Sequence, residues 1–268
     1  MSIQTLYTAA TGMMSLETKL DVIANNLANI ETTGFKRGRA NFEDLFYRID
    51  QMPGALDSAG EYTAVGTQIG LGARVSSTQT AAYTQGALEP SDNALHVAIE
   101  GNGFFQVLDP NGDTYYTRAG NFSRNVNGNL VAGSAQTGRL IEPPITIPDD
   151  ALYTNITADG RVQVRVPNQS TMQEVGQLEL ATFINPEGLL QLGENLLAET
   201  DASGAPLTGT PGENGRGVLR SRFLEKSNVE PVTEIIDLIT TQRAFEMNSK
   251  AVQTGDELLQ TVTNLKRF

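Results

Sequence analysis

The chain has 268 residues, a net charge of −12, a single histidine and no cysteine. The missing cysteines exclude disulfides, thiolate nucleophiles and cysteine metal sites, and one histidine alone cannot build a His-rich metal site. The acidic balance argues against a nucleic-acid binder, because phosphate contacts need clustered lysine and arginine.

The first predicted element is a long amphipathic helix. Its apolar side chains alternate between steps of three and four, which is typical of a buried helical stripe, at Ile3, Leu6, Ala10, Met13, Leu16, Leu20, Ile23, Leu27 and Ile30. We expect the helix to run from Ser2, as N-cap, to Thr33, with Gly34 ending it. Asn25, Asn26 and Asn29 either lie on the wet face or make hydrogen bonds across a helix interface.

The start of the chain shows no targeting or membrane segment. No stretch approaches the roughly 20 apolar residues of a spanning helix. The first residues, MSIQTLYTAA, lack the basic and apolar regions of a secretory signal. From these residues alone, the protein is expected to stay in the cytoplasm or to leave by a route that cleaves no signal.

Residues 47–86 are rich in Gly, Ser, Thr and Ala and contain the turn Pro53-Gly54. Such a segment is either a flexible linker or an extended arm. The alternation at residues 73–75 and the aromatic residues Tyr62 and Tyr83 favour an arm with some strand structure.

Strand patterns separated by turns follow, up to about Leu224. Residues 104–108 and 115–118 flank a turn with Asn111-Gly112 at its tip, which predicts a hairpin. Asn127-Gly128, Asp159-Gly160 and Asn214-Gly215 are similar turns. Strict alternation at residues 161–166, and over most of residues 177–184, indicates strands with one buried face. The middle is therefore predicted to be a compact β domain.

A second long helix is predicted after Ser227-Asn228, with Pro231 in its first turn and Phe268 at its end. Its apolar residues Leu238, Phe245, Val252 and Leu259 recur at intervals of seven. Residues 1–47 and 226–268 each carry a charge near −1, which leaves about −10 on the middle. Nearly neutral ends with apolar seams are expected to pack together.

Several patterns could be taken for chemical sites, and none is complete. Asp109, Asn111 and Asp113 match the first half of a calcium loop, but Thr114 and Gly120 stand where the loop needs Gly and Glu. The loop at residues 101–103 leads into a strand, so it is not a dinucleotide cradle. His96 lies in a strand-like run, and no spacing singles out a pair of carboxylates. We predict no catalytic residue, no metal site and no cofactor.

The predicted fold class is α+β. Residues 1–46 and 226–268 form a discontinuous helical coiled-coil domain from both chain ends, residues 47–86 an extended arm, and residues 87–225 a mainly antiparallel β domain. The predicted subunit-interface residues lie on the two helices: Leu6, Met13, Leu20, Ile23, Asn25, Asn26, Leu27, Asn29, Ile30, Ile235, Leu238, Gln242, Phe245, Asn248, Val252, Leu259 and Val262.

Both ends resemble the signatures of bacterial flagellar axial proteins of the rod and hook. The N-terminal likeness lies at residues 20–30 (LDVIANNLANI) and 33–37 (TGFKR), and the C-terminal one at 227–229 (SNV) and 241–252 (TQRAFEMNSKAV). Residues 99–107 and 116–122 resemble the core β domain of the same family. Within the family the length, the absence of an extra outer domain and the arm favour the distal-rod type over the longer hook subunit. The main competitor is the proximal-rod type, which is similar in size but whose C-terminal signature tends to differ around the stretch equivalent to residues 242–250.

The resemblance implies a structural subunit without enzymatic activity. It would be exported through the flagellar type III apparatus without a cleaved signal and would polymerise with copies of itself into the distal rod, which spans the periplasm. Its implied partners are the neighbouring proximal rod and hook proteins and the surrounding ring proteins, with no nucleic acid and no membrane insertion. The rival classes are a hook-type or proximal-rod paralogue, a periplasmic glycan-acting enzyme and a coiled-coil binding module.

Overall fold

The computed structural model describes residues 3–54, 65–136, 138–167 and 171–265. The chain divides into two compact units, each of which combines segments that are far apart in sequence. The first unit contains residues 1–27, 38–79 and 231–268, and the second contains residues 28–37 and 80–230. These units do not coincide with the ranges expected from composition, because residues 28–37 make their contacts with the β-rich unit and residues 38–79 with the helical one.

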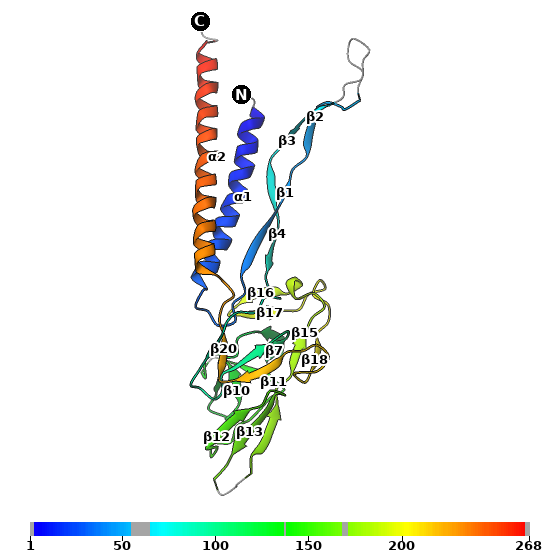
Figure 1. The fold of residues 1–268 in the computed structure, drawn as a ribbon, viewed down its shortest axis with the longest axis vertical. Helices are drawn as coiled ribbons and strands as arrows, with labels where there is room; N and C mark the ends of the chain where they lie inside the picture. Colours follow the sequence, from blue (N-terminus) through cyan, green and yellow to red (C-terminus); the bar gives the residue numbers. More distant parts are fainter. Residues whose placement is uncertain (1–2, 55–64, 137, 168–170, 266–268) are drawn as a thin grey trace. The chain divides into compact units, whose positions relative to one another are not determined.

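The first unit consists of two helices and a strand hairpin (Figure 1). Helix α1 spans Ile3–Ala28 and α2 spans Pro231–Leu265. The hairpin strands are β1 (Gly38–Asp44), β2 (Tyr47–Gln51), β3 (Thr67–Gly70) and β4 (Ala73–Thr80), with β1 paired to β4 and β2 to β3. Strand β1 lies within residues 1–46, the range predicted for the N-terminal part of the helical domain, so that this range holds strand as well as helix. No described helix is long and apolar enough to span a membrane.

Helix α1 ends at Ala28 and not at the predicted Thr33. The asparagines near its end favour turns over helix, and Asn29 accepts hydrogen bonds from the backbone nitrogen and hydroxyl of Thr32. Gly34 does adopt the expected left-handed conformation, with φ +72°, but in the loop after the helix. Helix α2 begins at Pro231, slightly later than the predicted start after Asn228, and proline is compatible with this first helical position.

The second unit is built from short antiparallel strands and one 3₁₀ turn, η1 (Pro186–Gly188). The strands are β5 (Leu88–Pro90), β6 (Val97–Glu100), β7 (Phe104–Leu108), β8 (Thr114–Thr117), β9 (Phe122–Arg124), β10 (Leu130–Ala132), β11 (Arg139–Glu142), β12 (Tyr153–Ile156), β13 (Arg161–Arg165), β14 (Gln173–Gln177), β15 (Leu180–Thr182), β16 (Leu190–Gly193), β17 (Leu196–Ala198), β18 (Leu207–Gly209), β19 (Val218–Ser221) and β20 (Phe223–Glu225).

The largest sheet has nine strands in the order β16-β17-β8-β7-β11-β10-β9, with β15 also paired to β7 and β18 to β15. A three-stranded sheet, β12-β13-β14, and the pairs β19-β6 and β20-β5 complete the unit. All the strand pairs of this unit are antiparallel, as predicted. The larger of two apolar clusters among the described residues of the unit includes Phe105, Phe122 and Leu180, and the smaller includes Phe104, Tyr116 and Phe183.

Two strand predictions have different outcomes. The hairpin with Asn111-Gly112 at its tip is confirmed, because β7 and β8 pair from Phe105 with Thr117 to Leu108 with Thr114. Residues 177–184, by contrast, do not form one strand. The chain leaves the three-stranded sheet after Gln177 and joins the large sheet at Leu180, so that Leu178 and Leu180 are both fully buried at the crossing.

Candidate functional site at the junctions of the two chain ends

The β-rich unit contains a buried cluster of three charged side chains from three distant segments. Glu225, at the end of β20, accepts hydrogen bonds from Lys36 and Arg118, each at 2.6 Å. The Glu225 side chain is fully buried, and those of Lys36 and Arg118 are 7% and 6% exposed. Because the two cations share one carboxylate, the loop after α1, the strand β8 region and the end of β20 are joined at one point.

Backbone groups complete the hydrogen bonding of this cluster. Lys36 also donates to the carbonyl oxygen of Thr84 at 2.7 Å, and the backbone nitrogen of Gly86 donates to Glu225 at 2.9 Å. Arg118 donates to the carbonyl oxygens of Ile99, Gly101 and Gly103. Buried charges need such partners, since an ionised group left unpaired in the interior is strongly unfavourable.

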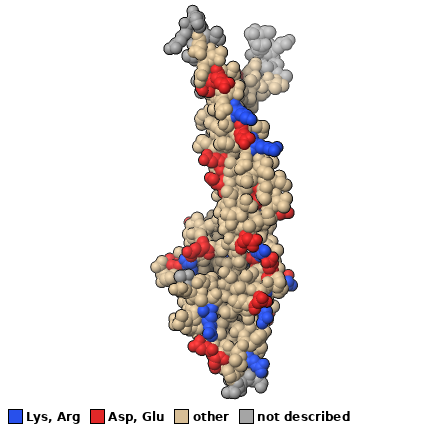
Figure 2. All heavy atoms as spheres, turned by 90° about the vertical axis from the view of Figure 1, so that its left-hand side faces the viewer, with Lys and Arg blue, Asp and Glu red and all other residues tan. Residues whose placement is uncertain are grey.

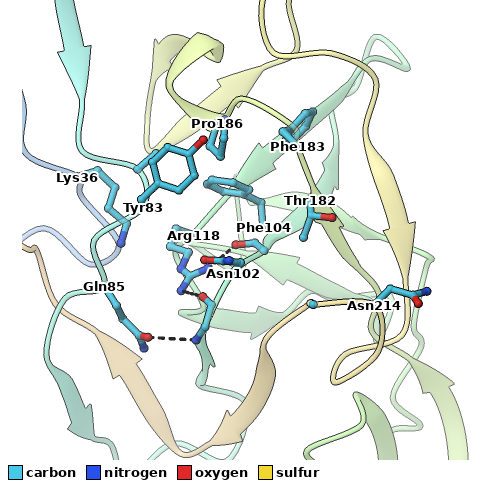
Figure 3. A pocket seen from close by; sticks show the side chains of 14 residues that line it. Lys36, Tyr83, Gln85, Asn102, Phe104, Arg118, Thr182, Phe183, Pro186 and Asn214 are labelled. Carbon is cyan, nitrogen blue, oxygen red and sulfur yellow. Dashed lines mark hydrogen bonds between the residues drawn. The ribbon is translucent and has the colours of Figure 1, made fainter.

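A pocket of about 150 Å³ lies beside this cluster (Figure 3). Its walls combine the charged ends of Lys36 and Arg118 with the rings of Tyr83, Phe104 and Phe183. Figure 3 shows Arg118 directed at the loop that contains Asn102, and Gln85 bonded to the backbone of the same loop. The pocket holds no group of three or more His, Asp or Glu side chains that could bind a metal, as is true of all the residues described.

Opposing effects set the pKa values in the cluster. Burial alone would raise the pKa of Glu225, but the attraction and hydrogen bonds of Arg118 and Lys36 outweigh it, so that the pKa lies below its ordinary value of 4.5. Burial lowers the pKa of Lys36 from 10.5, and Glu225 offsets this only in part. Both groups therefore bind protons less tightly in the folded than in the unfolded chain.

We expect this carboxylate to make stability pH-dependent in acid. Because the folded pKa of Glu225 is depressed, its contribution is complete above its unfolded pKa of about 4.5 and is lost as the pH falls through the folded pKa. Urea unfolding of the full chain from neutral pH down to about pH 3 should show a steeper loss of stability than in the Glu225→Gln variant, which cannot titrate there. Identical pH profiles for the two proteins would contradict this assignment.

Asn228 is a second link between the chain ends in this unit. Its side-chain oxygen accepts a hydrogen bond from the backbone nitrogen of Arg37 at 2.6 Å, and its side-chain nitrogen donates to the carbonyl oxygens of Ala81 and Thr84, both at 3.1 Å. One amide therefore joins the loop after α1, the segment after β4 and the approach to α2.

In the helical unit, Asn26 plays a comparable part. Its side-chain nitrogen donates to the carbonyl oxygen of Gly38 at 2.8 Å and to Glu234 of α2 at 3.2 Å, and its oxygen accepts from the Gly38 nitrogen at 2.8 Å. Asn26 is 1% exposed. Of the two alternatives for these asparagines, Asn26 makes a hydrogen bond between the two helices of one chain, whereas Asn25 is exposed.

The two helices are antiparallel neighbours within this unit. Asn26 of α1 contacts Glu234 of α2, and a Cβ placed on Gly12 of α1 would lie 3.3 Å from the side-chain nitrogen of Asn248 of α2. From the first contact to the second, the residue number falls along α1 and rises by the same amount along α2, so the helices run in opposite directions. The hairpin also contacts α1, because Thr11 and Ser15 donate to the carbonyl oxygens of Leu71 and Ala73. The chain ends and the hairpin thereby form one unit.

The predicted interface residues fall into groups of different exposure. Ile23 and Asn26 are buried, and Asn25, Ile235 and Gln242 are exposed. The side chain of Val262 lies outside the described residues. The others are half-buried: Leu6, Met13, Leu20, Leu27, Asn29, Ile30, Leu238, Phe245, Asn248, Val252 and Leu259.

The face of α2 opposite Glu234 carries an exposed apolar stripe. Its members recur at helical spacing and are 44–66% exposed: Val232, Ile235, Ile236 and Ile239. The space-filling view in Figure 2 shows charged side chains of both signs among other residues along the helical part of the molecule. An apolar stripe on a helix that already has a packed face needs a further partner to be buried.

The sequence analysis did not predict a site role for five residues of these clusters: Lys36, Arg118, Glu225, Asn228 and Glu234. Lys36, Arg118 and Asn228 fall inside segments that resemble family signatures, and Glu225 lies beside one. For the three charged residues, a charge within or beside such a segment is the signal that could have directed attention to them. Their pairing could not be derived, because Lys36 and Glu225 are 189 positions apart and Arg118 and Glu225 are 107 apart.

Three family models match the segments that form these junctions. "Flagella basal body rod protein" matches residues 6–36, "Flagellar hook protein FlgE/F/G D1 domain" matches residues 98–164, and "Flagellar basal body rod FlgEFG protein C-terminal" matches residues 220–265. Together with the fold, these matches define the rod and hook class of flagellar axial proteins.

Full-length relatives narrow the class further. The chain is 46% identical to the flagellar basal-body rod protein FlgG of Agrobacterium fabrum, covering 96% of this chain and 98% of that protein, and 44% identical to FlgG of Caulobacter vibrioides, covering 98% and 99%. The flagellar hook protein FlgE of Salmonella typhimurium is only 25% identical, over 96% of this chain and 99% of that protein. The chain belongs to the FlgG family of flagellar basal-body rod proteins.

Family membership decides between the rival classes. Rod proteins are structural components of the flagellum, so the chain is a structural subunit and not an enzyme. The much lower identity to the hook protein disfavours the hook-type alternative.

Proposed function

We propose that this chain, as a structural subunit of the flagellar distal rod, polymerises through its terminal helices into a rigid helical shaft that transmits motor torque to the hook. The observation that supports this most is the pair of opposite faces on α2. One face carries Glu234 toward Asn26 of α1, and the other presents Val232, Ile235, Ile236 and Ile239 to solvent. Polymerisation would bury the second face.

The terminal domain is proposed to form a coiled coil with neighbouring copies. The exposed residues Ile235, Gln242 and Asn25 would contact other subunits, while Leu238, Phe245, Val252 and Leu259, which are half-buried in one chain, would become fully covered. Ends that bury their seams only in the polymer are expected to gain order on assembly. The Asn26–Glu234 hydrogen bond would then fix the register within each subunit.

Charged substitutions in the exposed stripe test the helical interface. The double variant Ile235→Asp, Ile239→Asp is expected to abolish incorporation into the rod, because unpaired charges cannot be buried in an apolar seam. The β-rich unit should stay folded, since neither residue belongs to it. Immunoblots of purified basal bodies measure incorporation, and Thr240→Asp, at an exposed polar position of the same helix, is the control. Normal incorporation of the double variant would rule out this face.

The hairpin is proposed to be the arm that stiffens the shaft. Its side chains include the exposed aromatic residues Phe46 and Tyr47, at 87% and 54% exposure. If these side chains insert between neighbouring subunits, the hairpin would hold the helical packing rigid. Tyr62, which helped to predict the arm, lies outside the described residues.

Deleting residues 47–70 is expected to give either no rod or a more bendable one. The deletion removes β2 and β3 and leaves the pairing of β1 with β4 possible. Electron microscopy of isolated basal bodies would measure rod curvature and length. The matched control is Gln68→Ala, an exposed polar change in β3 that leaves the aromatic residues in place. Straight rods of normal length in the deletion strain would contradict a stiffening role.

The route and partners of the subunit are also part of the proposal. The chain would pass through the flagellar type III export apparatus without cleavage of a signal, and it would assemble across the periplasm. The proximal rod and hook proteins would meet the polymer at its two ends, and the basal-body ring proteins would surround it.

Electron microscopy of basal bodies from a strain that lacks this gene tests the proposed function. We expect basal bodies that stop before the distal rod and carry no hook. Basal bodies that lack all of the rod would favour a proximal-rod role, and a complete rod without a hook would favour a hook-type role. Intact basal bodies would overturn the proposal.

A further inference from the structure

Four Asn-Gly dipeptides occur in the chain, and the structure holds them very differently. They are Asn102-Gly103, Asn111-Gly112, Asn127-Gly128 and Asn214-Gly215. In Asn-Gly the backbone nitrogen of the glycine can attack the side-chain amide of the asparagine, because glycine has no side chain to hinder the approach. Whether this occurs in a folded protein depends on how free the two groups are.

Two of these dipeptides have their glycine nitrogen occupied. The Gly112 nitrogen donates to the carbonyl oxygen of Asp109 at 2.9 Å, and the Asn111 amide donates to the Asp109 carboxylate at 3.0 Å. The Gly128 nitrogen donates to the carbonyl oxygen of Asn125 at 3.0 Å. Attack at either site would first require these hydrogen bonds to break.

Asn102-Gly103 is clamped by its surroundings. Arg118 donates to the carbonyl oxygens of Gly101 and Gly103, on either side of Asn102, and the carbonyl oxygen of Asn102 accepts from the Gly217 nitrogen at 2.7 Å. Gly103 is also buried. The backbone rotation that attack requires is therefore opposed at this position.

Asn214-Gly215 lacks these restraints. Both residues are exposed, with φ +50° and +78°, at the tip of a turn closed by the hydrogen bond from the Arg216 nitrogen to the Glu213 carbonyl oxygen at 2.9 Å. Among the described residues, none accepts a hydrogen bond from the Gly215 nitrogen or contacts the Asn214 amide through one. A Cβ placed on Gly215 would have no atom within 4 Å.

We propose that Asn214 is a site of spontaneous deamidation in the folded protein. The Gly215 nitrogen forms a bond to Cγ of Asn214 and loses its proton, the bond from Cγ to Nδ2 breaks, and ammonia leaves. Water then adds to one of the two carbonyls of the resulting succinimide ring and breaks its bond to nitrogen. The products are aspartate and isoaspartate, and no oxidant or cofactor is needed.

The modification would change the surface beside the pocket of Figure 3. Asn214 lines the edge of this pocket, and Figure 3 shows its side chain directed away from Arg118. Deamidation replaces a neutral amide by a carboxylate, and the isoaspartate product also adds a backbone methylene to the turn between β18 and β19. A subunit that persists for long would thus acquire an additional negative charge at this turn.

Peptide mapping by mass spectrometry of the full-length protein, aged in mildly alkaline buffer, tests this proposal. We expect Asn214 to deamidate at least about tenfold faster than the other three asparagines, since those three sites must open locally first. Incorporation of heavy oxygen from labelled water would identify the hydrolysis step. Comparable or faster conversion at Asn102, Asn111 or Asn127, or no conversion at Asn214, would overturn the proposal.

Two controls separate structure from sequence. In the chain unfolded by denaturant all four dipeptides should convert at similar rates, and the preference for Asn214 should vanish. The Gly215→Ala variant should slow conversion at Asn214, because a methyl group hinders the approach of the nitrogen, and should leave the other sites unchanged. A preference for Asn214 that persists in the denatured chain would refute a structural origin.

Discussion

Replacing Glu225 by glutamine is expected to destabilise the β-rich unit by about 3–5 kcal/mol, because Lys36 and Arg118 would remain buried without a countercharge. For a unit of this size the midpoint of thermal unfolding should fall by roughly 10 °C. Circular dichroism of the full-length protein during heating measures the change. Most of the expected loss of stability comes from leaving the two buried cations without a countercharge, because glutamine could still accept some of the hydrogen bonds.

A matched ion pair on the surface serves as the control. Glu89 lies 2.9 Å from Lys226, and both side chains are well exposed, so Glu89→Gln should cost less than about 1 kcal/mol. Adding Lys36→Met to Glu225→Gln should recover part of the loss, since one of the two unpaired charges is removed. A Glu225 variant no less stable than the Glu89 control would show that the buried cluster does not hold the unit together.

Gly120→Ala is expected to be the second severe substitution. A Cβ at this position would overlap the carbonyl oxygen of Val97 and would lie 3.3 Å from the ring of Phe105, both of which belong to packed core strands. The Val97 nitrogen also donates to the Gly120 carbonyl oxygen at 3.0 Å, so the two backbones cannot separate without losing that bond. We expect a loss of about 3 kcal/mol, at the upper end of overpacking effects.

The control for this substitution is Gly112→Ala. Gly112 has φ +92° at the hairpin tip, and a Cβ there would meet no atom within 4 Å, so only backbone strain of about 1–2 kcal/mol should appear. Equilibrium urea unfolding measures both variants. Equal losses for the two would mean that the close approach of Gly120 to Val97 is relieved at little cost.

The sequence could predict those helices, strands and turns that are determined by residues close together in the chain. The β7–β8 hairpin follows from Asn111-Gly112 at its tip, the buried face of β13 from Val162 and Val164, and the start of α2 from Pro231. The pairing of the two helices could also be predicted, since each carries an apolar seam and has no partner nearby in sequence.

Features that depend on distant contacts could not be predicted. Asn26 bonds to Gly38, and nothing in the periodicity of residues 3–30 distinguishes that asparagine from Asn25. The Glu225 cluster requires three segments to meet, so composition and spacing could identify its members only as charged residues within strand-like or signature segments.

The position of Glu225 near the end of the β-rich unit has a consequence for the order of folding. A chain that emerges from its N-terminus exposes Lys36 and Arg118 long before the carboxylate that neutralises them, and β5 must likewise wait for β20. Contacts between residues so far apart in sequence form slowly, because a long loop must close first. A chain that is truncated or only partly emerged therefore lacks the carboxylate that neutralises Lys36 and Arg118. The β-rich unit can complete its fold only when the last quarter of the sequence is present.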